Sequence, residues 1–252
     1  MITFVGAGPG AEDLITVRGQ NKLKEADVVI YAGSLVNPAL LKMCREECEI
    51  YNSAEMTLEE VMEVMIKGES SGKKVVRLHT GDPCLYGAIK EQMDELDRRK
   101  IPFEDCPGVG SFCGAAAALK AEYTLPGISQ SVVITRMAGR TPVPEKESIR
   151  SFAAHQATMV LFLSTGMLEK LSEELVAGGY QEETPAAIVY KATWPEEKVM
   201  HCTVGTLAET AEREKVTKTA LIVVGNVLNT EYERSKLYDP AFTTEFRKGK
   251  EV

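Results

Sequence analysis

Three glycine-rich segments stand directly after runs that predict β-strands. They are Gly6–Ala11, Thr80–Gly87 and Pro107–Phe112. Glycine lets a ligand approach the backbone closely, and a helix that begins behind such a loop directs N–H groups at the ligand. In an open α/β sheet the ligand crevice lies at the carboxyl ends of the strands. Three such segments in one half of the chain therefore predict a backbone-lined pocket at one sheet edge.

The first segment fits the glycine pattern of dinucleotide-binding loops. Within it, Pro9 has no N–H to offer a pyrophosphate. The second predicted strand runs into Tyr31-Ala32-Gly33-Ser34, without the acidic residue that binds ribose in that motif. Both features argue against an NAD site. Two interpretations stay open: a tight strand-to-helix turn with no ligand, and a glycine loop beside a different ligand.

Side chains in two other segments suggest contacts to a ligand. Asp82 could accept hydrogen bonds from hydroxyl or amino groups, or it could cap a helix predicted over 88–98. Arg136 and Arg140 follow a later predicted strand, and guanidinium groups bind carboxylates bidentately. An anion grip and solvated surface arginines are both open interpretations of this pair.

Composition excludes several classes of function. The 29 basic and 37 acidic residues of the 252-residue chain give a net charge of −8, which argues against broad nucleic-acid binding. The six cysteines form no Cys-x-x-Cys pair, and His79, His155 and His201 are scattered, so we expect no protein metal site and no triad. No apolar run approaches about 20 residues, and the first residues lack a basic n-region. We therefore expect a cytoplasmic protein.

Strand and helix patterns alternate along the chain, which predicts an α/β fold with mixed, mostly parallel sheets. The pattern resets near 122–129, so we expect two α/β domains, 1–121 and 122–252. In the second domain, strand-like runs at 186–190 and 199–204 flank Pro195 without a helix between them, and they predict a hairpin.

The helices of the first half are predicted from apolar spacing and capping residues. A helix over 57–67 has Thr57 and Glu60 placed as a capping box. A second helix is expected over 13–26 with an interruption near Gly19, and a third over 38–47.

Taken together, these blocks resemble the tetrapyrrole methylase family, the S-adenosylmethionine-dependent enzymes of cobalamin and sirohaem synthesis. The resemblance spans nearly the whole chain. It is carried by Val5–Gly10 with Leu14–Thr16, Gly81–Pro83 with Tyr86–Gly87, Pro107–Val109, Thr135–Arg136, Pro185–Tyr190, Gly205–Leu207 and Ala220–Gly225.

The resemblance implies a reaction and a branch of the family. The stretches 31–36, 135–144 and 190–195 are similar to members that methylate C-11 of precorrin-4 or cobalt-precorrin-4. Uroporphyrinogen methylases carry an Asp where this chain has Ala32. The alternatives are another precorrin position, uroporphyrinogen III or the modified histidine of elongation factor 2. Outside the family, they are a non-catalytic binding protein and, more distantly, an NAD-dependent oxidoreductase.

The resemblance also implies two α/β domains with the cofactor cleft between them, a homodimer, and S-adenosylmethionine as cofactor with S-adenosylhomocysteine as product. No catalytic base is assigned, because methyl transfer relies on positioning. Carried over by position, the cofactor residues are Pro9, Gly81, Asp82, Leu85, Gly110, Ser111, Leu163, Ala192, Thr219 and Ala220. Gly110 departs from the Ser or Thr that relatives often carry after Pro-Gly-Val.

A tetrapyrrole with acetate and propionate arms is polyanionic, so a protein of net charge −8 needs local positive charge to bind it. The residues expected to supply that charge are Arg18, Arg77, Arg136, Arg140 and Lys191.

Overall fold

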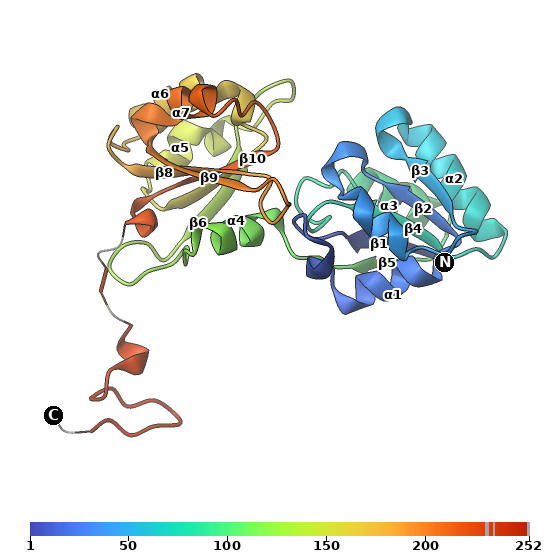
Figure 1. Ribbon diagram of the computed structural model, residues 1–252, viewed down its shortest axis with the longest axis horizontal. Helices are drawn as coiled ribbons and strands as arrows, with labels where there is room; N and C mark the ends of the chain where they lie inside the picture. The colour runs from blue at the N-terminus through green and yellow to red at the C-terminus, as the bar shows by residue number, and fades with distance from the viewer. Residues whose placement is uncertain (230–231, 234, 251–252) are drawn as a thin grey trace. The chain divides into compact units, whose positions relative to one another are not determined.

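The computed structural model describes residues 1–229, 232–233 and 235–250. By contacts, the chain divides into two compact units (Figure 1). Unit 1 comprises Met1–Ala115 and Lys191–Glu197, and unit 2 comprises Ala116–Tyr190 and Lys198–Val252. The loop 191–197 thus belongs to unit 1, although the strands on either side of it belong to unit 2. The boundary expected at 121/122 stays a prediction about folding domains.

Unit 1 contains a five-stranded sheet in the order β3-β2-β4-β1-β5, and every neighbouring pair in it is parallel. Its strands are β1 Ile2–Gly6, β2 Val28–Tyr31, β3 Glu49–Asn52, β4 Val75–His79 and β5 Phe103–Cys106. Its helices are α1 Val17–Glu25, α2 Leu58–Ser70, α3 Lys90–Arg98 and the start of α4 Ser111–Leu119.

Helices cover both faces of this sheet, which is why its central strands are buried and mostly apolar. Leu23 of α1 packs with Val5 and Leu78 on one face. Met65 of α2 and Leu96 of α3 pack with strand residues on the other face. A strand buried on both sides needs consecutive apolar residues rather than alternating ones.

Unit 2 contains a mixed sheet in the order β6-β7-β10-β8-β9. Its elements are β6 Val132–Arg136, α5 Ile149–Ala153, β7 Thr158–Phe162, α6 Leu168–Ala177, β8 Pro185–Tyr190, β9 Lys198–Thr203, α7 Leu207–Arg213 and β10 Ala220–Val224. Only β6 and β7 pair in parallel; the other neighbours are antiparallel. Helices α5, α6 and α7 gather on one face (Figure 1). The predicted hairpin is confirmed as β8–β9.

Several predicted elements change in detail. The capping box of α2 is confirmed, since the Glu60 N–H donates to Thr57 Oγ1 at 3.2 Å and the Thr57 N–H donates to Glu60 Oε2 at 2.7 Å. The helix expected from residue 13 starts at Val17, because Thr16 caps it. Gly19 does not interrupt this helix; a Cβ there would lie 3.1 Å from Val5, so glycine permits close packing on β1.

Two further differences concern the segment between β2 and α2. Residues Pro38–Met43 form a 3₁₀ helix that ends before the predicted residue 47. The strand β3 was not predicted, because its sequence, Glu-Ile-Tyr-Asn, lies half exposed at the sheet edge and lacks an apolar pattern.

Candidate functional site

The order of the sheet in unit 1 brings the three glycine-rich loops together. Strands β4, β1 and β5 are adjacent and parallel, with Gly6 paired to His79 and Val5 paired to Cys106. Their carboxyl ends therefore lie at one edge. The loops that follow them are Gly6–Ala11, Thr80–Gly87 and Pro107–Gly110, as the spacing predicted.

Glycines let these loops touch backbone to backbone. Gly8 and Gly81 exchange two hydrogen bonds: the Gly81 N–H donates to the Gly8 carbonyl at 2.8 Å, and the Gly8 N–H donates to the Gly81 carbonyl at 3.2 Å. A Cβ on Gly108 would lie 2.3 Å from the Gly81 oxygen, and one on Gly6 would lie 2.5 Å from the Gly108 Cα. No other residue fits at these two positions without moving backbone.

The carboxylate of Asp82 ties the second loop to the third. Its Oδ1 accepts from the Cys84 N–H at 2.8 Å, and its Oδ2 accepts from the Gly108 N–H at 2.9 Å. Partial burial acts to raise the pKa of Asp82, but hydrogen bonds from Cys84 and Gly108 outweigh it and hold the pKa below its usual value. Asp82 is not the cap of α3, which begins at Lys90 with Ile89 as its N-cap residue.

Three N–H groups of the first loop are already used by protein acceptors. Ala7 donates to the His79 carbonyl at 2.7 Å, Gly8 donates to Gly81, and Ala11 donates to Thr193 Oγ1 at 3.0 Å. Pro9 has no N–H. A pyrophosphate would have to displace these bonds, so the loop geometry argues against a dinucleotide site.

The other expected cofactor residues of unit 1 surround this edge. A Cβ on Gly81, whose φ is +61°, would lie 3.0 Å from Ser111 Oγ, so Ser111 is close to the second loop. Gly110 precedes α4 directly, Leu85 is half-buried, and Ala192 is buried in loop 191–197.

In unit 2 the remaining expected cofactor residues share another sheet edge. Leu163 follows β7, and Ala220 begins β10, which is antiparallel to β7. Thr165 Oγ1 donates to the Ala220 carbonyl at 3.2 Å and thereby links the two strand ends. Arg136 ends β6, which is parallel to β7, so it lies at the same edge.

Two residues at this edge have a left-handed backbone conformation. Leu163 has a φ of +52°, and its side chain is 65% exposed; Thr219, just before Ala220, has a φ of +59°. Left-handed backbone is uncommon for residues other than glycine and is an outlier for a β-branched residue such as threonine. Strain of this kind clusters at ligand sites. An exposed, strained leucine is therefore a candidate contact for an apolar part of a ligand.

The expected carboxylate-binding residues fall into different environments. Arg136 is half-buried, and its guanidinium donates to the carbonyls of Met137, Thr141 and Pro142 at 2.9–3.3 Å. Arg140 and Arg18 are exposed. Arg136 thus shapes the loop after β6 through bonds to neutral carbonyls.

Arg77 lies elsewhere, in the core of unit 1. It is 6% exposed and donates to Gln92 Oε1 at 3.2 Å and to the Ile30 carbonyl at 3.1 Å; burial lowers its pKa to about 10. Gln92 in turn donates to the Ala88 carbonyl at 3.0 Å. This chain of hydrogen bonds supports the loop that ends at Ala88, and we leave Arg77 out of the proposed substrate site.

Sequence reasoning missed the contacts of Thr193 and Trp194, which lie in loop 191–197. Trp194 Nε1 donates to the Pro9 carbonyl at 3.1 Å. The available signal was the chain's only tryptophan, placed beside a proline in the predicted hairpin turn.

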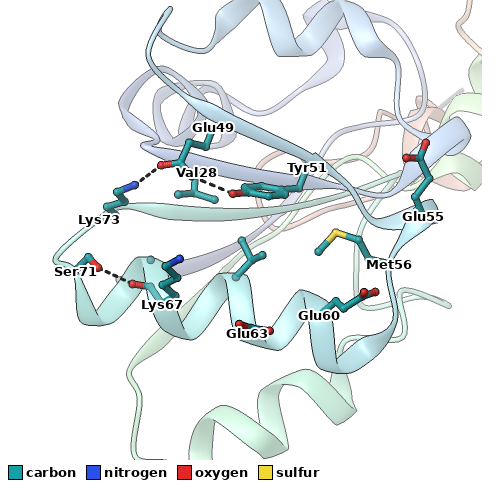
Figure 2. A pocket seen from close by; sticks show the side chains of 12 residues that line it. Val28, Glu49, Tyr51, Glu55, Met56, Glu60, Glu63, Lys67, Ser71 and Lys73 are labelled. Carbon is teal, nitrogen blue, oxygen red and sulfur yellow. Dashed lines mark hydrogen bonds and ion pairs between the residues drawn. The ribbon is translucent and has the colours of Figure 1, made fainter.

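A groove between β3 and α2 is separate from these edges (Figure 2). Glu49 pairs with Lys73 and accepts a hydrogen bond from the Tyr51 hydroxyl at 3.0 Å. Strands β2 and β4 separate β3 from β1. We assign this groove no ligand.

The described residues contain no group of three or more His, Cys, Asp or Glu side chains arranged to hold a metal ion. Burial raises the pKa of Cys48 to about 12 and also raises that of Cys44, so both thiols stay protonated at neutral pH. Within residues 1–229, 232–233 and 235–250, no helix is long and apolar enough to cross a membrane.

The fold is α/β, with glycine-rich loops at the strand ends of unit 1 and with Arg136 beside strained backbone at a sheet edge of unit 2. The profile of the family described as Tetrapyrrole (Corrin/Porphyrin) Methylases matches residues 1–208. The chain belongs to this family, and it is a methyltransferase.

Individual relatives agree with the family assignment. A cobalt-precorrin-4 C(11)-methyltransferase of Methanocaldococcus jannaschii is 55% identical over 98% of this chain and 96% of its own length. The X-ray structure of a cobalt precorrin-4 methyltransferase matches with a TM-score of 0.89 and 45% identity, over 90% of this chain and 95% of that one. A Thermus thermophilus uroporphyrin-III C-methyltransferase complexed with S-adenyl homocysteine matches with a TM-score of 0.75 and 26% identity. The match covers 92% of this chain and 95% of that one.

Proposed function

We propose that this protein transfers a methyl group from S-adenosylmethionine to C-11 of cobalt-precorrin-4, a step in building the corrin ring of cobalamin. The near-full-length likeness to cobalt-precorrin-4 methyltransferases carries this proposal. The glycine-rich edge of unit 1 supports the proposal. N–H groups of its first loop are hydrogen-bonded within the protein, which suits a ligand other than a dinucleotide.

The cofactor would be held mainly by backbone and small residues. Pro9, Gly81, Asp82, Leu85, Gly110, Ser111, Leu163, Ala192, Thr219 and Ala220 are the residues proposed for this role. Strand-end carbonyls and N–H groups suit the amino-acid part and the adenosine hydroxyls, while the exposed side chain of Leu163 suits the adenine face.

The cofactor supplies a methyl group activated on a sulfonium. In the reaction a ring-carbon electron pair forms the new C–CH₃ bond while the S–CH₃ bond breaks, and S-adenosylhomocysteine leaves with that bond's electrons. The protein's task is to hold the two reactants in line and to exclude water, and such positioning lowers a displacement barrier substantially. We assign no catalytic base.

The macrocycle's carboxylates would be bound by Arg18, Arg136, Arg140 and Lys191. A guanidinium forms paired, charge-assisted hydrogen bonds with a carboxylate. Arg136 is the strongest candidate, since its partners in the protein are neutral carbonyls.

The test combines binding and turnover. Calorimetry should show binding of S-adenosylmethionine and S-adenosylhomocysteine and none of NAD. Anaerobic turnover of cobalt-precorrin-4 with a ¹³C-methyl donor should then label C-11, as read by NMR. Label at another ring carbon would place the enzyme on a different intermediate, and NAD binding alone would overturn the proposal.

We also propose that the enzyme works in the cytoplasm as a homodimer. Sedimentation equilibrium of the full chain should give twice the 27.6 kDa chain mass. A value of one chain mass across micromolar concentrations would contradict the dimer.

A further inference from the structure

The side chain of Trp194 lies across the first glycine loop. Its indole N–H donates to the Pro9 carbonyl at 3.1 Å, and the neighbouring Thr193 Oγ1 accepts from the Ala11 N–H at 3.0 Å. Asn37 Nδ2 donates to the Gly10 carbonyl at 2.8 Å. Loop 191–197 therefore forms hydrogen bonds with the residue before Gly10 and with the residue after it.

Two glycines make room for this contact. A Cβ on Gly10 would lie 2.0 Å from Trp194 Cδ1, which is an overlap. A Cβ on Gly114 would lie 2.7 Å from the Pro9 Cβ and 3.3 Å from the Thr193 Cγ2. Gly10 does not adopt a left-handed φ, so its lack of a side chain is explained by the indole and not by the backbone.

The same indole orients a positive charge. Lys191 Nζ stands 5.0 Å from the centroid of the Trp194 ring and 3.2 Å from Glu196 Oε1. A cation over a tryptophan face within about 6 Å is attracted by the ring. Lys191 and Thr193 both have positive φ, +45° and +69°, so the loop is held in a strained shape by these contacts.

We propose that Trp194 is a positioning residue for methyl transfer. Its N–H fixes the Pro9 turn expected to hold the cofactor, and its ring face fixes the Lys191 ammonium expected to bind a substrate carboxylate. One side chain thereby sets two binding functions, and the N–H contact can be removed while an aromatic face is kept. This inference rests on the proposed function.

Two substitutions separate the roles. Trp194→Phe keeps an aromatic face for Lys191 but removes the N–H, so the Kd for S-adenosylhomocysteine should rise about 3- to 10-fold while the KM for cobalt-precorrin-4 stays within twofold. Trp194→Leu removes both, so the KM should also rise about 2- to 5-fold. Thr193→Val is the control that removes only the Ala11 contact, and it should affect cofactor binding alone.

A double-mutant cycle tests the close contact between Gly10 and the Trp194 indole. Gly10→Ala should weaken S-adenosylhomocysteine binding at least tenfold in the wild-type background, because its methyl group overlaps the indole. In a Trp194→Ala background the same substitution should change the Kd by less than twofold. Circular dichroism and the melting midpoint of each variant establish that it is folded.

The outcomes distinguish failure of the positioning role from failure of the proposed function. If Trp194→Phe and Trp194→Leu bind S-adenosylhomocysteine as tightly as the wild type does, the positioning role is overturned and the proposed function stays intact. The same holds if the effects of Gly10→Ala and Trp194→Ala on the Kd are additive. A wild-type protein that binds no S-adenosylhomocysteine would overturn both. If Trp194→Leu fails to fold, Trp194→Phe decides the result. Emission of this sole tryptophan should change on saturation of the wild type with S-adenosylhomocysteine; an unchanged spectrum would count against the inference.

Discussion

At the scale of single residues, Asp82 connects two loops through a charged acceptor. Hydrogen bonds to a charged group contribute about 1.5–3 kcal/mol each. Asp82→Ala should therefore lower stability by a few kcal/mol at most, while the Kd for S-adenosylhomocysteine rises at least tenfold as the second and third loops separate. Calorimetry and urea unfolding measure the two effects.

Asp97→Asn is the control for Asp82, because it removes an exposed carboxylate from α3 and not from the strand-end loops. A variant at position 82 that loses stability but binds the cofactor normally would make Asp82 a purely structural residue. The folded pKa of Asp82 lies below its usual 3.8, so its contribution to stability is present above that value and is lost as the pH falls through the folded pKa.

A second prediction concerns Arg136. Arg136→Gln keeps amide donors for the carbonyls of the loop 137–142 but removes the charge. We expect the KM for the tetrapyrrole to rise about tenfold or more, in line with loss of a charged hydrogen bond, while S-adenosylhomocysteine binds unchanged. Steady-state kinetics and calorimetry provide the comparison. Equal KM values for the variant and the wild type would remove Arg136 from the substrate site.

Residue-level prediction worked where local sequence carries the chemistry. The loops containing Gly6, Gly81 and Gly108 are predictable because each follows a run that predicts a strand. The contact of Trp194 with Pro9 joins residues 185 positions apart, and no local pattern reports it. The burial of Arg77 was also hidden, since an arginine among valines and leucines can equally end in solvent.

At the scale of elements, strand β4 carries a histidine that must stay neutral. His79 is 4% exposed, and its Nε2 has no hydrogen-bond partner among the described residues. Burial, together with the nearby Arg77 charge, lowers the pKa of His79 to about 3. The unfolded chain binds this proton near pH 6.5, whereas the folded chain does not.

Stability should therefore decline as the pH falls from 6.5 toward 3, by up to about 1.4 kcal/mol per pH unit from this group. His79→Leu should flatten that part of the stability curve. Chemical unfolding at several pH values measures it, and the exposed His155→Gln is the control. If the free energies of unfolding of His79→Leu and the wild type depend on pH in the same way, His79 is solvated.

Element prediction depended on burial. Strands β1 and β10 are buried along their whole length, and their apolar runs were readable from sequence. Strand β3 was not, because an exposed edge strand needs no apolar pattern. The start of α1 was set by the Thr16 cap, a local interaction that outweighed the apolar periodicity used to place the helix.

At the scale of the whole molecule, the two sheets were predictable from alternating strand and helix patterns. The membership of loop 191–197 in unit 1 was not, because the loop joins two strands of unit 2 and its partners are set by tertiary packing. Sequence reasoning describes a hairpin turn correctly but does not reveal which surface the turn contacts.

The net charge of −8 leads to a final prediction about how the substrate approaches. At 0.01 M salt the screening length is about 30 Å, so a polyanionic tetrapyrrole is repelled by the whole protein. Near 0.15 M it is about 8 Å, and the approaching molecule senses mainly the local arginines and Lys191. The association rate should therefore rise with salt to a maximum and then fall as these contacts are screened in turn.

S-adenosylhomocysteine has no net charge at neutral pH, so it serves as the control, and its association rate should stay flat over the same range. Anaerobic stopped-flow measurements from 0.01 to 0.5 M salt give both rates. A substrate rate that falls steadily from the lowest salt would mean that the basic residues dominate the field even at long range. In that case the charge that attracts the substrate is arranged by the fold and cannot be read from the net charge of the chain.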